Sequence, residues 1–342
     1  MSFRSFFLKI RPAEWIILAT AVWIGAVRLV VEGGLSLGYV LGGVLEELAL
    51  WTLIVGFFFL LYIGFELVFS FGKSSLNSLL ARLIEGAGGF RDLMPLLFLS
   101  FVFTNIGAGY SLVRKTGFKD ITPLLLKADE IIFGVQPSVC MQEVVRPILT
   151  EYMSMIYMVY PGIVLLAAFW LRWRHGGDVC KDYVLALVLA SCIAYVFFIL
   201  LPAVSPEYVI EYWRPLSGHY FTNSLRVFLG NARSIENDCC LFPSLHVGLS
   251  TLAWLYVRRA QSRLNIPFAV LAVSEWVSPV YLRRHYAVDA LAGIMLALFC
   301  YHASLEINRR WRERRVFLRE YYAAPKNEPS PEDEECYESQ KH

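Results

Sequence analysis

The stretch Phe242-Pro243-Ser244-Leu245-His246 opens one long apolar run, and Arg283-Arg284-His285-Tyr286-Ala287-Val288-Asp289 opens another. Together they hold two of the six histidines of the chain. Apolar runs of about 20 residues have the length needed to cross the hydrocarbon core of a bilayer as a helix. We therefore expect both stretches to lie at the mouths of membrane spans, facing water at the same membrane surface.

The composition indicates a membrane protein. The chain has 342 residues, of which 57% are hydrophobic and 18% charged, and its mean hydropathy is +0.51. A soluble domain of this length needs more charge on its surface. The predicted fold class is therefore all-α, a polytopic membrane helical bundle. The net charge of +2 is too small to indicate a nucleic-acid partner, and the seven cysteines contain no C-x-x-C pair that would suggest a metal site.

About eight spans are expected from the apolar runs. We divide the chain into N-terminal spans of unassigned role (1–92), a membrane catalytic domain (93–304) and a tail (305–342) that is basic, then acidic and partly disordered. The sixth span and the last two are short, which suits helices packed inside a bundle. The first is expected to be a span and not a cleavable signal peptide. The predicted spans are 14–31, 49–71, 93–113, 153–171, 183–203, 242–257, 267–284 and 286–304.

The distribution of Lys and Arg predicts the orientation of the chain. With the N-terminus in the cytoplasm, the inside segments hold about twice as many basic residues as the outside segments. Both termini are therefore expected in the cytoplasm, and both histidine stretches on the extracytoplasmic face. Residues 121–133 carry apolar side chains at helical spacing, which predicts a short interfacial helix.

The first stretch has the features of an anion site. Pro243 suits the first position of a helix, where its missing N–H would have no partner. The N–H groups of Ser244, Leu245 and His246 then lie in the first turn without intrahelical acceptors, and such a turn binds anions. The Ser244 hydroxyl adds a donor, and His246 lies close to any anion bound there.

The second stretch has the features of an oriented nucleophile. His285 and Asp289 are spaced i, i+4, so a helix beginning here places them on one face. The carboxylate can accept from one ring nitrogen and leave a lone pair on the other. Arg283 and Arg284 are expected to neutralise phosphoryl oxygens or, alternatively, to anchor the span at the interface.

The two stretches together predict metal-free phosphate-ester chemistry with no cofactor. In this hypothesis His285 attacks phosphorus and forms a phosphohistidine, while Asp289 stabilises the charged ring. His246 protonates the leaving oxygen and then activates an acceptor, which is water, a lipid hydroxyl or another alcohol. The donor partner is a membrane phospholipid.

These residues resemble the type-2 phosphatidic-acid phosphatase superfamily, in which Pro-Ser-x-His precedes His-x-x-x-Asp. The forms present here, together with Leu201–Pro206 and Asp129–Gly134, look more like its inositol-phosphorylceramide synthase branch. The resemblance covers roughly residues 120–300. It implies a core of the later spans with His285 as nucleophile, His246 as acid and Asp289 as the carboxylate, and a lipid phosphotransferase activity.

Two departures favour transfer over phosphate release. The phosphatases have a Lys seven residues before an Arg-Pro pair, but here Glu207 precedes Arg214-Pro215. Ser278-Pro279 stands where those enzymes have Ser-Arg. The lost cations fit a phosphodiester, which carries less charge to neutralise than a monoester. Arg214 remains a candidate phosphate ligand, and the alternative activity is a phosphatase for lipid phosphates or polyprenyl pyrophosphates.

Other interpretations remain open from the residues alone. A non-catalytic transporter or scaffold would keep the fold without the chemistry, and a zinc site from His219, Asp238 and the two motif histidines is disfavoured. Glu275 lies inside a predicted span, so it is expected to be protonated or to pair with an arginine such as Arg28. A disulfide from Cys140 to Cys239 or Cys240 would tie the long outer loop to the active face.

Overall fold

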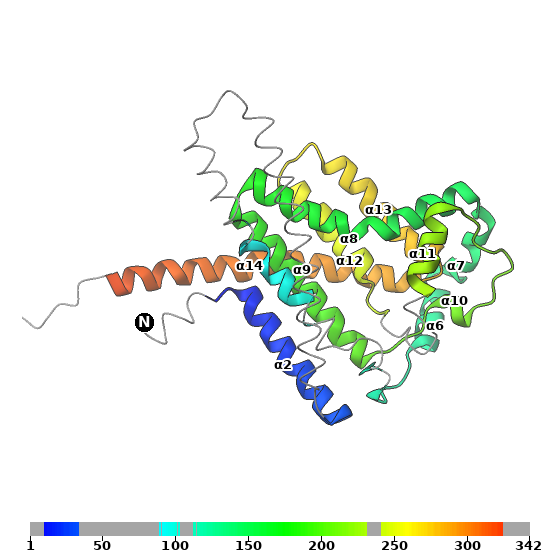
Figure 1. Cartoon of the computed structure of the whole chain (residues 1–342), viewed down its shortest axis with the longest axis horizontal. Helices are drawn as coiled ribbons and strands as arrows, with labels where there is room; N and C mark the ends of the chain where they lie inside the picture. The colour runs from blue at the N-terminus through cyan, green and yellow to red at the C-terminus, as the bar shows by residue number, and fades with distance from the viewer. Residues whose placement is uncertain are drawn as a thin grey trace, which may run out of the picture.

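The described part of the chain is a bundle of helices, with no strand in it (Figure 1). The structure is a computed structural model that describes residues 10–33, 89, 91–100, 102, 112–113, 115–230 and 241–323. The helices are α2 (Pro12–Glu32), α6 (Thr122–Phe133), α7 (Pro137–Cys140), η2 (Met141–Val144), α8 (Pro147–His175), α9 (Gly177–Leu200), α10 (Pro206–Val209), α11 (Tyr220–Gly230), α12 (Leu245–Arg259), α13 (Asn265–Tyr281) and α14 (Ala287–Ala323).

Within the described residues, four helices are long and apolar enough to span a membrane: α2, α8, α9 and α14 up to Leu318. The chain is a multi-pass membrane protein. Helices α12 and α13 coincide with two further predicted spans but have only 15 and 17 residues. The predicted span 49–71 lies outside the described residues, and 93–113 is described only in part.

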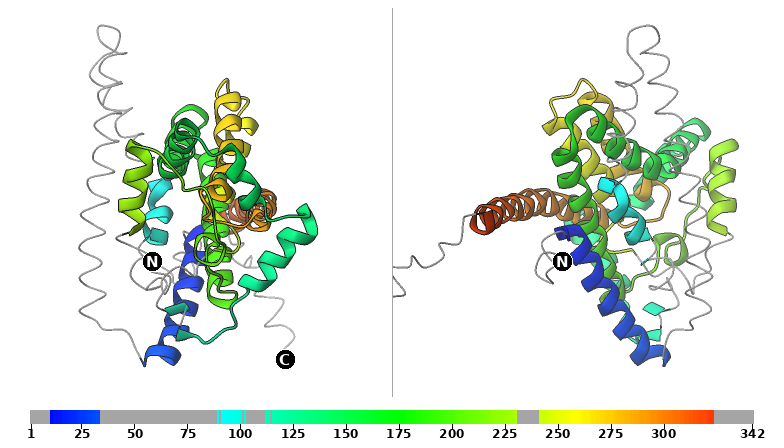
Figure 2. Two further views of the ribbon diagram at one scale, coloured as in Figure 1. Left: turned by 90° about the vertical axis from the view of Figure 1, so that its right-hand side faces the viewer. Right: turned by 60° about the vertical axis from the view of Figure 1, so that its left-hand side comes forward.

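Helix α12 is the centre of the bundle, in contact with α8, α9, α13 and α14. This position explains why so short a helix is stable in a membrane, since its neighbours cover most of its surface. Figures 1 and 2 show α2 lying along the outside of α9, with which it packs. The short helices α6, α7, α10 and α11 gather at one end of the bundle, beside the first turn of α14 (Figure 1).

Helix α14 is longer than the predicted span, which ended at 304. It runs to Ala323, and its last third projects beyond the other helices (Figure 1). The extension is polar, and ion pairs one turn apart reinforce it: Arg309 and Arg310 both pair with Glu306, at 2.8 and 2.5 Å. The first part of the predicted tail is therefore a continuation of the last span.

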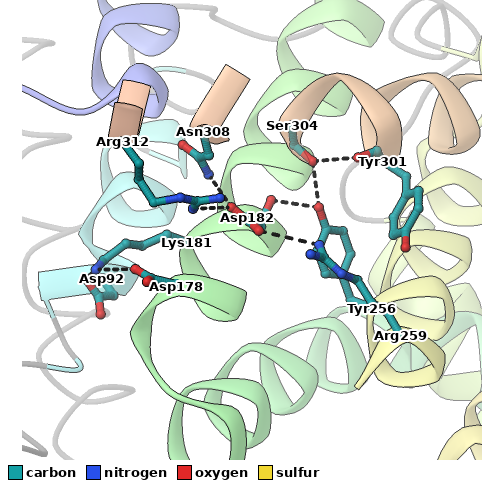
Figure 3. Close-up of polar contacts among 10 residues, drawn as sticks. All are labelled: Asp92, Asp178, Lys181, Asp182, Tyr256, Arg259, Tyr301, Ser304, Asn308 and Arg312. Atoms are coloured by element: carbon teal, nitrogen blue, oxygen red, sulfur yellow. Dashed lines mark hydrogen bonds and ion pairs between the residues drawn. The ribbon is translucent and has the colours of Figure 1, made fainter. Parts of the chain in front are cut away.

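Charged residues join α9, α12 and α14 at the end of the bundle opposite the first turn of α14. Figure 3 shows their contacts. Asp182 of α9 is 3% exposed, and its carboxylate accepts hydrogen bonds from Asn308 at 2.9 Å and Arg312 at 3.0 Å. Arg259, at the end of α12, pairs with its other oxygen at 3.4 Å. A single carboxylate thus ties α9, α12 and α14 together.

A second buried carboxylate at the same end fixes α2. Asp92 pairs with Arg11 at 2.9 Å and with Arg172 at 3.1 Å, and Lys181 lies 4.0 Å away. These contacts gather basic residues from the start of α2, the end of α8 and the start of α9 at one end of the bundle.

Candidate active site

The two histidine stretches meet at the end of the bundle where α12 and α14 begin. The rings of His246 and His285 have centroids 5.8 Å apart and an interplanar angle of 62°. His246 lies in the first turn of α12, and His285 in the turn between α13 and α14. Residues about 40 positions apart in the sequence therefore form one site, as the shared membrane surface predicted.

His285 is oriented by the carboxylate that its spacing predicted. Its Nδ1 lies 3.4 Å from Asp289 Oδ2, and the same oxygen accepts the backbone N–H of Tyr286 at 3.2 Å. Asp289 is fully buried and His285 is 5% exposed. The contact uses Nδ1, so Nε2 is the nitrogen available for chemistry.

The start of α14 is fixed from another part of the chain by Asp129. The two carboxylate oxygens of this α6 residue accept the N–H groups of Ala287 at 3.0 Å and Val288 at 2.8 Å. These are first-turn donors that α14 itself cannot satisfy. Burial raises the pKa of Asp129 above its ordinary value. Asp129 is thus a cap supplied by the predicted interfacial helix, and it holds the turn that carries His285.

The first turn of α12 lies directly against α14. Pro243 was expected at the first helical position, but it precedes Ser244, which is the N-cap residue of α12. The N–H of Ser244, expected to be free for an anion, instead donates to the carbonyl of Asp289 at 3.2 Å. The Ser244 hydroxyl is completely buried and has no hydrogen-bond partner among the described residues. A buried hydroxyl without a hydrogen-bond partner at the start of a helix is suited to binding an anion.

Aromatic side chains of α8 enclose the ring of His246. Tyr157 stacks on it with centroids 4.2 Å apart and an interplanar angle of 17°, and Tyr160 lies at the same distance with a tilt of 47°. Neither tyrosine was predicted as a site residue from the sequence. Their i, i+3 spacing on a predicted span was a signal that two aromatic rings share one face.

The three predicted arginine ligands have partners within the protein. Arg214 donates from Nη1 to the carbonyls of Gln142 and Glu143, at 3.2 and 3.1 Å. Arg284 pairs with Glu207, the residue that stands where the phosphatases carry Lys. The Arg214 bonds hold the loop 204–216 to η2, and the pair of Arg284 with Glu207 holds the same loop to the turn before α14.

Arg283 occupies an unusual backbone conformation in that turn. Its φ of 64° lies in the left-handed region, which a residue with a side chain adopts at some cost. Its guanidinium lies 4.0 Å from the centroid of the Tyr212 ring and donates to the carbonyl of Arg214. The loop contacts therefore compensate for the strained turn that precedes His285.

Glu275 does not pair with Arg28, the partner suggested from the sequence. Arg28 instead pairs with Glu32 of its own helix, at 2.6 Å. Glu275 Oε1 lies 3.4 Å from Nδ1 of His246. The sequence could not reveal this contact, because it depends on how α12 and α13 pack.

Two minor predictions concern residues at the edge of the site. His219 donates its backbone N–H to Glu151, which caps the start of α11. Cys140 is exposed and unpaired among the described cysteines. Cys239, Cys240 and Asp238 lie outside the described residues, so the disulfide remains a prediction.

Comparison with known families identifies the superfamily of the chain. The family model of the PAP2 superfamily matches residues 129–303, just over half of the chain, and the match includes both histidine motifs. The chain belongs to the PAP2 superfamily. It is thus a membrane enzyme, a phosphatase or phosphotransferase, which confirms the predicted superfamily and sets aside the transporter or scaffold alternative. Comparison with curated proteins and with solved structures finds no match.

Proposed function

We propose that this enzyme transfers a phosphorylated headgroup from a phospholipid to a lipid hydroxyl through a phosphohistidine at His285. The observation that carries this choice is the ion pair between Arg284 and Glu207. One cation beside the proposed nucleophile is already neutralised, and the lysine of the phosphatases is replaced by an acid. A phosphodiester carries one negative charge and a monoester close to two, so the diester suits this site better.

In the first step, Nε2 of His285 attacks phosphorus while Asp289 stabilises the ring that becomes charged. The bond from phosphorus to the lipid oxygen breaks, and that oxygen takes a proton from Nε2 of His246. The diacylglycerol departs, and the headgroup phosphate remains bonded to His285.

In the second step, the acceptor hydroxyl gives its proton to His246, and its oxygen bonds to phosphorus. The bond from phosphorus to His285 breaks, which restores both histidines. Ser244 and the N–H groups of the first turn of α12 bind the phosphoryl oxygens throughout. Arg283 joins them when its guanidinium exchanges the carbonyl of Arg214 for the substrate, while Arg284 keeps its pair with Glu207.

We place this site on the extracytoplasmic face. The opposite end of the bundle gathers Arg11, Arg172, Lys181, Arg259 and Arg312 around two buried carboxylates. Basic residues are enriched on the cytoplasmic side of membrane proteins, which supports N- and C-termini in the cytoplasm. The first described helix, α2, starts at this basic end.

The test uses purified enzyme in liposomes with headgroup-labelled phosphatidylinositol as donor. The acceptor is ceramide, or a diacylglycerol whose acyl chains differ from those of the donor so that the product is distinguishable. A new labelled phospholipid, absent with His285→Ala, supports the proposal. Inorganic phosphate released from phosphatidic acid or a polyprenyl pyrophosphate, with no transfer product, overturns it in favour of the phosphatase alternative. Turnover by His285→Ala would overturn the assignment of the nucleophile.

A further inference from the structure

Glu275 is a buried carboxylate that the mechanism above does not use. It lies in α13, one turn and a half before the loop that carries His285, and it is 1% exposed. A carboxylate in the interior of a membrane bundle is costly unless it has a partner. Such a residue therefore points either to a specific contact or to a function.

The contacts of Glu275 lead directly to the site. Its Oε1 lies 3.4 Å from Nδ1 of His246, and its Oε2 accepts the Ser278 hydroxyl at 3.3 Å. The contact with Ser278, one turn along α13, aims the carboxylate at α12. The aromatic rings of Tyr157 and Tyr160 hold His246 on its other sides.

A small cavity adjoins this carboxylate. Its volume is about 10 Å³, and its lining includes Glu275, Tyr160 and Ser250. That volume is about the size of one water molecule, and three polar side chains line it. The rest of its lining is apolar and includes Ile156, Phe268 and Leu271, so the contacts with His246 and Ser278 are the main polar surroundings of Glu275.

We propose that Glu275 is the positioning carboxylate of His246, as Asp289 is of His285. This inference rests on the proposed role of His246 as proton donor and acceptor. In this role Glu275 accepts a hydrogen bond from the Nδ1–H group of His246, which fixes the ring and leaves Nε2 to deliver and recover the proton that moves in each step. Its charge also stabilises the imidazolium form that must be present when the leaving oxygen departs.

The arrangement gives each histidine a carboxylate from a different helix. The ionisable groups that face His246 are Glu275 of α13, His285 at the start of α14, and Tyr157 and Tyr160 of α8. Asp289 reaches His246 only through His285. Of these groups, Glu275 alone offers a carboxylate to the Nδ1 of His246 within the described residues.

The test is the substitution Glu275→Gln, which keeps the shape and removes the charge. We expect kcat to fall about 100-fold with KM changed less than about twofold, because the loss concerns proton transfer and not substrate binding. The alkaline limb of the kcat profile, which reports loss of the proton from the acid, should move to lower pH by about one unit. A purely structural glutamate would not move that limb.

Glu32→Gln is the matched control. Glu32, the last residue of α2, pairs with Arg28 of the same helix and with Lys115, and neither motif histidine is among these partners. Its substitution therefore tests loss of a paired carboxylate without loss of the proposed function. We expect its kcat and pH profile to equal those of the wild type. Should Glu275→Gln not fold, Glu275→Asp keeps the charge. It should lower kcat and leave the alkaline limb where it is.

The activity measured is whichever phosphate ester the wild type uses, by transfer or by hydrolysis. A wild type that only releases phosphate overturns headgroup transfer and still permits this test. A Glu275→Gln enzyme with wild-type kcat and an unmoved limb, while His246→Ala is inactive, overturns the role of Glu275 alone. A lower melting temperature with unchanged kcat and pH profile also overturns it, since it makes Glu275 structural.

Discussion

The substitution Gly293→Ala tests the packing that brings the two histidines together. Gly293 is buried in α14, where it faces the first turn of α12. A Cβ there would lie 2.4 Å from the carbonyl oxygen of Ser244 and 3.2 Å from Cβ of Val247, whereas ordinary contact begins near 3.4 Å. Because the nearest atom belongs to the backbone, α12 and α14 must separate by about 1 Å.

That separation acts directly on the proposed chemistry. It lengthens the hydrogen bond from the Ser244 N–H to the Asp289 carbonyl, which is 3.2 Å, and moves His246 away from His285. A misplacement of 1 Å between reacting groups lowers rates by about 100-fold. Overpacking also lowers the free energy of unfolding by about 1–3 kcal/mol.

The assay compares kcat and melting temperature of Gly293→Ala with those of Gly162→Ala, in detergent and in liposomes. Gly162 lies in α8, and a Cβ there meets nothing within 4 Å, so its alanine variant should match the wild type or be slightly more stable. A Gly293→Ala enzyme with kcat within about twofold of the wild type, given the 100-fold loss expected from a 1 Å shift, would refute the reasoning.

Three further predictions concern the residues around this packing. Asp129→Asn replaces one of two capping oxygens with an NH2 group, so the free energy of unfolding should fall by about 1 kcal/mol and the melting temperature should fall with it. Burial raises the pKa of Asp129, so ionisation of its carboxyl is less favourable in the folded protein than in the unfolded chain. The difference in stability between the wild type and Asp129→Asn should therefore shrink as pH rises from about 4 through the folded pKa, which thermal unfolding at several pH values measures. Glu207→Gln releases Arg284 for the substrate, so KM should fall severalfold. Arg284→Ala should raise KM, and steady-state kinetics of both variants measure the two changes. Asp182→Ala leaves Arg312 and Arg259 without their acceptor, so stability should fall by about 3 kcal/mol with KM unchanged, as chemical denaturation and kinetics will show.

The sequence predicted the parts of the site that depend on neighbouring residues. The i, i+4 spacing placed Asp289 against His285, because this relation follows from helix geometry alone. The start of α12 was located near Pro243, but the first helical residue is Leu245, after the N-cap Ser244. Apolar runs located α8 and α9, although α8 begins at Pro147, six residues before the predicted span, where proline suits a first turn.

The parts that the sequence could not predict join residues distant along the chain. Asp129 caps α14 from more than 150 positions away, and Glu275 reaches His246 across the contact of α12 with α13. No local periodicity encodes such pairs, since they depend on how whole helices pack. The same holds for Arg284 and Glu207, where the sequence showed a missing lysine but not that its replacement would bind the arginine.

The carboxylate of Asp182 has a consequence for how the chain is made. Ribosomes release α9 long before α14, so a nascent chain carries Asp182 without Asn308 and Arg312, two of its three side-chain partners. An unmatched acid at the edge of a bilayer keeps the helix that bears it near water. The contacts that join Asp182 to α14 therefore form only once translation has passed residue 312. A chain cut short before that point should persist as an unassembled intermediate and be open to membrane proteases, even with both histidine motifs already synthesised.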